Sequence, residues 1–74
     1  MINVLQKLEP YFDIEEIKTK FPDVDNVLEL AVLVLRSNNC SYGQIQSWLG
    51  NPSKKWIRSV LLKWAPELID IKTN

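Results

Sequence analysis

The sequence predicts an all-α, or nearly all-α, single domain, built as a small bundle of four to five short helices. Apolar residues recur at the three- and four-residue spacing of helices, and little of the chain shows the two-residue alternation of strands. Most apolar segments begin after a helix-capping side chain and end at a proline or a glycine. A chain of 74 residues with 46% hydrophobic content is enough for one core and too short for two domains.

Two short helices are predicted in residues 1–24, as an extension of a core that we assign to residues 25–74. The first begins after Asn3, which can cap it, and ends near Pro10. The second begins after Asp13 and carries two glutamates in its first turn, where the helix dipole favours anions. The residue types of this extension indicate packing, and two interpretations remain open: an addition to the core, or a surface that holds a partner.

A third helix is predicted over residues 26–37, and it is apolar on almost every side. Between Val27 and Leu35 only Glu29 is polar. Such a helix either lies at the centre of the bundle or keeps one face for a partner. In so small a domain we favour the central position, and a homodimer through Val27–Leu35 is the alternative.

The fourth helix is predicted over residues 41–49, where the sequence carries a capping box. Ser41 is followed three residues later by Gln44, so each side chain can bond the backbone N–H of the other residue. Gly50 suits the left-handed turn that ends a helix.

The fifth helix is predicted to follow at once, over residues 52–65. Asn51 is the expected N-cap, Pro52 takes the first helical position, and Ala65-Pro66 ends the helix. Residues 67–74 alternate apolar and polar side chains and predict a short strand.

The last two helices and their link have the order of a helix-turn-helix, in which the second helix enters the major groove of DNA. Residues 38–74, which contain the segments "SYGQIQSWLG", "NPSKKWIRSVLLKW" and "ELIDIKT" in this order, resemble the core of winged-helix DNA-binding domains. The resemblance implies a short strand at Asn39-Cys40. It also implies a wing after the fifth helix, for which only one strand's worth of sequence remains.

Helical projection divides the fifth helix into two faces. One continuous apolar stripe, about 140° wide, consists of Trp56, Val60, Trp64, Ile57 and Leu61. The opposite face carries Lys54, Arg58, Lys55, Ser59 and Lys63. The basic residues therefore share the face that points away from the predicted core.

Each of five residues on or beside this basic face has a predicted contact with DNA. Arg58 can bind guanine O6 and N7 in a bidentate manner. Lys54 and Lys55 suit phosphate or groove contacts, and Ser53 can donate to a phosphate at the helix start. Lys63 would touch the phosphate backbone.

Leu62 lies among these charges and fits the pattern poorly. Three interpretations remain open: contact with a thymine methyl, packing under the C-terminal tail, or a place in a protein interface. Tyr42, Gln44 and Gln46 are candidates for further contacts with the DNA backbone, although Gln44 is less free if it closes the capping box.

The three tryptophans are expected to pack in the core, because tryptophan supplies a large buried area to a small domain. Trp56 and Trp64 belong to the apolar stripe, and Trp48 shares a helix side with Ile45 and Leu49. Base stacking on an exposed ring is the alternative.

Several functions are excluded or disfavoured by composition. Cys40 is the only cysteine and the chain has no histidine, so a disulfide within the chain, a Cys/His zinc site and histidine-based catalysis are excluded. We expect no enzyme activity, no cofactor and no small-molecule ligand. The longest apolar run, Leu30–Leu35, is far shorter than the roughly 20 residues of a membrane span, and we expect an intracellular protein.

Charge is unevenly distributed although its total is zero. Residues 51–74 hold five basic and two acidic side chains, a net of +3, whereas residues 1–50 hold four basic and seven acidic ones, a net of −3. A basic third indicates a polyanion partner, so the predicted function is double-stranded DNA binding, as a small transcriptional or recombination regulator or as a module of a larger protein. The zero total and acidic first part favour the alternative, a protein-interaction module such as an adaptor or a phage-type binder of a host factor.

Overall fold

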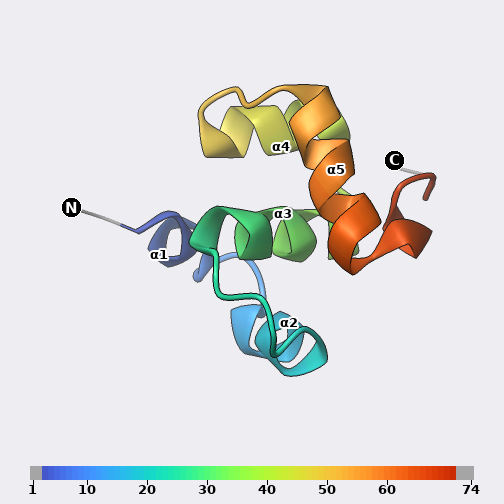
Figure 1. The fold of residues 1–74 in the computed structure, drawn as a ribbon. Coiled ribbons are helices and arrows are strands. Elements are labelled where there is room, and N and C mark those ends of the chain that lie inside the picture. The colour runs from blue at the N-terminus through green and yellow to red at the C-terminus, as the bar shows by residue number, and fades with distance from the viewer. Residues whose placement is uncertain (1–2, 72–74) are drawn as a thin grey trace.

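The computed structural model describes residues 3–71 and shows five α-helices and one short 3₁₀ helix in this range (Figure 1). In chain order they are α1 (Val4–Leu8), α2 (Ile14–Lys20), α3 (Val27–Ser37), α4 (Tyr42–Leu49), α5 (Lys54–Trp64) and the 3₁₀ helix η1 (Pro66–Leu68). The described range contains no strand. The predicted all-α bundle of short helices is confirmed.

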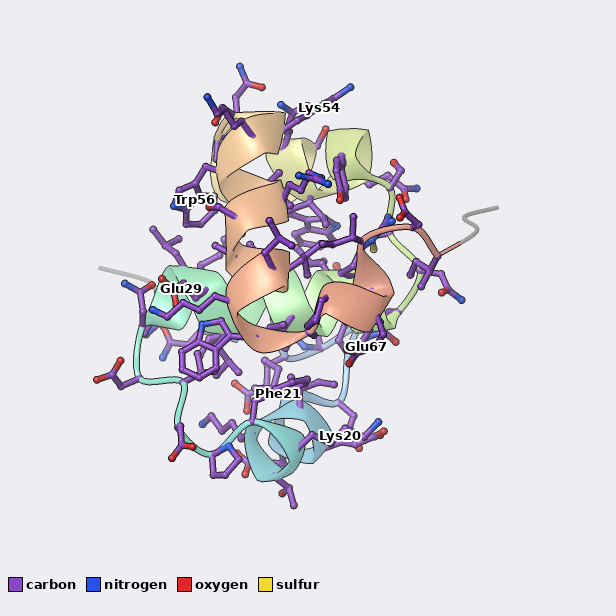
Figure 2. The ribbon with its side chains drawn as sticks, turned by 45° about the vertical axis from the view of Figure 1, so that its right-hand side comes forward. Lys20, Phe21, Glu29, Lys54, Trp56 and Glu67 are labelled. Carbon is purple, nitrogen blue, oxygen red and sulfur yellow. The ribbon has the colours of Figure 1, made fainter. Side chains whose placement is uncertain are left out.

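Helix α3 is the centre of the bundle, because each of the other four α-helices packs against it. Its residues from Leu30 to Arg36 are all buried, which confirms the central position predicted from its apolar sequence. In both views α2 lies on one side of α3, and α4 with the start of α5 lies on the other (Figure 1, Figure 2). Of the apolar residues between Val27 and Leu35, only Val27 and Leu28 in the first turn are exposed.

The predicted caps fix the starts of three helices. Asn3 and Ser41 each form a capping box, and the Asp13 carboxylate accepts a hydrogen bond from the Glu16 N–H at 3.1 Å. Gly50 ends α4 in the left-handed conformation, with φ of 82°. Short helices gain little from their own backbone bonds, so α1 and α2 depend on the packing of their buried side chains.

The start of α5 differs from the prediction. Asn51 was expected to cap the helix, but its φ of 65° is left-handed and its N–H donates to the Gln46 carbonyl at 2.7 Å. Asn51 therefore ends α4 together with Gly50, and Pro52 lies in the link between the helices. Ser53 is the N-cap of α5, and its hydroxyl oxygen accepts from the Trp56 N–H at 3.0 Å.

The predicted strands are also corrected. Residues 66–68 form η1, residues 69–70 form a turn, and Asn39 adopts a left-handed turn conformation with φ of 64°. Leu68 at the end of η1 and Ile69 in the turn both pack against the core, so the apolar residues here do not belong to a strand. Residues 72–74 of the predicted strand lie outside the described range.

Candidate nucleic-acid interface

Helix α5 is held on the bundle by the predicted apolar stripe. Ile57, Val60 and Leu61 are buried in the core, and Trp56 and Trp64 pack against it while staying partly exposed. Figure 2 shows α5 running along the outside of the bundle, with Lys54 at the end remote from α2. The other face of α5 is therefore free to meet a partner.

Three cations occupy the outward face of α5 in its first two turns. Lys54, Lys55 and Arg58 are exposed, and none has an ion-pair partner among the residues that the structure describes. Ser59 shares this face, but its hydroxyl donates to the Trp56 carbonyl at 2.6 Å. We call Lys54, Lys55 and Arg58 the cationic face.

Ser53 joins the cationic face at the start of the helix. Because its hydroxyl oxygen already accepts the Trp56 N–H, the hydroxyl proton is the group that remains for a contact with a phosphate. The predicted site residues Ser53, Lys54, Lys55 and Arg58 are thus brought together on one helix end.

Lys63 is set apart from the other four predicted site residues. Its ammonium lies 3.6 Å from the Glu29 carboxylate and 5.0 Å from the centre of the Trp64 ring. The same carboxylate oxygen accepts a hydrogen bond from the Trp64 indole N–H at 2.7 Å. Glu29 therefore joins α3 to the end of α5. The one sequence signal for this role was that Glu29 is the single polar residue between Val27 and Leu35.

The other candidates for contact with the DNA backbone are engaged within the protein. The Gln44 side chain accepts from the Ser41 N–H at 2.8 Å, as the capping box predicts. The Gln46 amide donates to the Pro52 carbonyl at 2.9 Å, which fixes the link between α4 and α5. The Tyr42 hydroxyl donates to the Ile69 carbonyl at 3.2 Å.

Arg36, at the end of α3, was not recognised from the sequence as an interior residue. It is only 4% exposed, and its guanidinium donates to the carbonyls of Leu68, Ile69 and Cys40 at 2.7, 2.7 and 2.9 Å. Its terminal carbon lies 4.7 Å from the centre of the Tyr42 ring. This arginine ties the last described turn to the core and is unavailable to a polyanion.

Cys40 beside it is half-buried, as expected for a packing residue. Burial raises the pKa of its thiol, although the neighbouring Arg36 charge acts in the opposite direction. The neutral thiol is therefore favoured.

The tryptophans combine core packing with partial exposure. Each of the three packs against the buried cluster, which confirms the main prediction, and each keeps part of its ring in solvent. The Trp48 ring meets Tyr11 and Phe12 of the α1–α2 link, with ring centres 5.7 and 6.0 Å apart.

Acidic side chains gather on the opposite side of the bundle from the cationic face. Exposed carboxylates on α2 and beside it are Asp13, Glu15, Glu16, Asp23 and Asp25. Lys18 and Lys20 form ion pairs with two of them, at 3.5 and 3.6 Å. Figure 2 shows this separation, with Lys20 on α2 and Lys54 at opposite ends of the molecule.

A cleft lined by both polar and apolar side chains lies between the start of α3 and the link before α5. Its volume is about 340 Å³, and it is lined by Asn26, Leu28, Glu29, Leu49, Pro52 and Trp56. Leu28 at its edge is 46% exposed.

Comparison of this chain with protein-family models, curated proteins and solved structures found no match. Among the described residues, no helix has the length and apolar content needed to cross a bilayer. Nor does that range hold a group of three or more Cys, Asp or Glu side chains arranged to bind a metal ion.

Proposed function

We propose that the chain binds double-stranded DNA through a helix-turn-helix made of α4, residues 50–53 and α5. In this proposal α5 is the recognition helix, and the protein acts as a small transcriptional or recombination regulator or as the DNA-binding module of a larger protein. The proposed contacts come from α5 and from Ser53, the N-cap that precedes it, and the described range has no wing strands.

The cationic face is the observation that carries the proposal. Among the other described basic residues, Lys18, Lys20 and Lys63 are paired with carboxylates and Arg36 is buried. Lys7 is exposed and has no ion pair among the described residues, but it is the single basic residue of α1. Lys54, Lys55 and Arg58 are instead grouped, exposed and turned away from the acidic side of the bundle. Such a group attracts the phosphates of DNA and orients the protein as it approaches.

The proposed contacts differ in kind. Arg58 lies in the second turn of an exposed helix, and its planar guanidinium can bind both major-groove acceptors of guanine. Lys54 and Lys55 supply point charges for phosphates, and Ser53 donates to a phosphate at the helix start. Lys63 can reach a phosphate only by weakening its contact with Glu29.

A salt series on duplex DNA tests this proposal. If three cations neutralise three phosphates, the logarithm of affinity falls with the logarithm of salt with a slope of about −2.7, which is about 40-fold between 50 and 200 mM. Lys55→Gln reduces this slope by about 0.9. The measurement is fluorescence anisotropy of a labelled duplex of random sequence.

Lys20→Gln is the matched control, because it removes the same charge from α2 at the opposite end of the molecule. It leaves the slope unchanged if α5 is the contact. An equal effect of Lys20→Gln and Lys55→Gln would show that only total charge matters, and absence of binding at low salt would refute DNA binding.

Protein binding is the second candidate function, and two exposed apolar residues at the start of α3 favour it. Val27 and Leu28 stay exposed in the first turn of α3, and a second copy that binds there would give the two-fold symmetry a palindromic DNA site requires. Sedimentation at rising concentration tests this candidate. A dimer that Leu28→Asp converts to monomer supports it, and a monomer throughout rules out self-association.

A further inference from the structure

Leu62 is the most conspicuous apolar residue on the outward face of α5. Its side chain is 52% exposed, although η1 and the turn that follows lie beside the same end of the helix. The described tail turns toward Arg36 and leaves Leu62 open to solvent, so packing under residues 65–71 does not account for it. The Leu62 side chain is therefore accessible to a binding partner.

The position of Leu62 relative to the cationic face is specific. At about 100° per residue, Leu62 projects about 40° from Arg58 and about 20° from Lys55. These three residues therefore form the middle of the face opposite the buried stripe. At about 1.5 Å per residue, Leu62 lies about 6 Å beyond Arg58 along the helix axis.

A recognition helix presents the middle of its outward face to the floor of the major groove. The thymine C5-methyl group is the apolar feature that base edges display there. A leucine gains contact with that methyl, and it gains nothing from phosphates or from the polar edges of other bases. A spacing of about 6 Å corresponds to about two base pairs at 3.4 Å each.

We propose that Leu62 is a specificity-determining residue that contacts the methyl group of a thymine about two base pairs from the guanine bound by Arg58. This inference rests on the proposed DNA-binding function and extends it from affinity to sequence preference. It predicts that the protein prefers DNA sites in which a guanine and a thymine lie at a fixed spacing.

The test begins with selection of the preferred duplex from a random library by the full chain. Each thymine in the selected site is then replaced by deoxyuridine, which keeps pairing and removes only the methyl group. For the unmodified protein, one replacement weakens binding by about fourfold, the value expected for one buried methyl. The Leu62→Ser variant binds the thymine and deoxyuridine duplexes equally. The Leu62→Met variant and the control variant Lys63→Ala both keep the preference for thymine.

Replacement of guanine by 7-deazaguanine locates the second contact. The guanine whose replacement weakens binding by unmodified protein, but not by Arg58→Ala, lies about two base pairs from the sensitive thymine. Circular dichroism of each variant checks that α5 stays folded, as expected for changes at exposed positions.

The outcomes separate the two proposals. Binding with a defined site but no Leu62-dependent difference between thymine and uracil overturns the role of Leu62 and leaves DNA binding standing. Binding without any sequence preference also overturns the role of Leu62 and leaves DNA binding standing. Absence of binding overturns both, and loss of self-association in Leu62→Ser would then assign Leu62 to a protein interface.

Discussion

The end of α3 and the outward face of α5 each present an arginine, and the two regions use it in opposite ways. Arg36 is buried, and three backbone carbonyls accept hydrogen bonds from its guanidinium. Arg58 is exposed and has no ion-pair partner among the described residues. One arginine completes the fold, whereas the other is free to bind.

The difference shows why a count of charges indicates little about binding. A buried guanidinium without a carboxylate is stable only if other acceptors replace water, and the turn at Leu68 and Ile69 supplies them. The net charges of the two parts of the chain include Arg36 and the paired lysines on equal terms with Lys54. Only the grouping of unpaired cations on α5 distinguishes a surface suited to a polyanion.

The largest expected effect concerns Arg36. Arg36→Ala removes three hydrogen bonds from a charged group and leaves the partly buried Leu68 and Cys40 carbonyls without this donor, so the free energy of unfolding falls by about 3 kcal/mol. Urea denaturation followed by tryptophan fluorescence measures this change. Arg58→Ala is the matched comparison and changes stability by less than about 0.5 kcal/mol, because its side chain is exposed. Equal losses in both variants would contradict the contrast between the two regions.

An intermediate effect is expected at Ser53, where a structural role and a binding role coincide. Ser53→Ala removes the cap of α5 and lowers the free energy of unfolding by about 1 kcal/mol. Ser53→Asp restores the cap, but its charge repels a nearby phosphate by about 1 kcal/mol, or about fivefold in DNA affinity. Thermal melts and DNA titrations of the two variants separate the roles. If Ser53→Asp binds DNA as well as the unmodified protein, the helix start lies away from the phosphates.

The smallest effect is expected at Lys63. Because this residue is paired with Glu29 at the protein surface, Lys63→Gln lowers stability by less than about 0.5 kcal/mol. Its effect on the salt slope of DNA binding is less than half that of Lys55→Gln. A full change of about 0.9 in slope would show that Lys63 contacts a phosphate together with the cationic face.

Most of the secondary structure could be predicted from local sequence. The N-cap at Asn3, the capping box at Ser41 and the left-handed Gly50 were predicted correctly, because each depends on side chains within a few residues. The second half of a capping box at Asn3, supplied by Gln6, was not predicted. The stripe of α5 followed from helical periodicity. The start of α5 was placed two residues early, since an Asn-Pro pair suits both a helix start and the end of the preceding helix.

The sequence predicted which residues make up the candidate site, but not which of them are buried, paired or exposed. The sequence alone determined which side chains share the outward face of α5, because a helix converts spacing into direction. Only the tertiary structure decided that Arg36 lies inside, that Glu29 holds Lys63, and that Leu62 stays exposed. The hydrogen bonds that hold these groups join residues 32 to 35 positions apart in the sequence: Arg36 with Leu68 and Ile69, and Trp64 with Glu29. No local sequence pattern encodes which partners such distant groups will find.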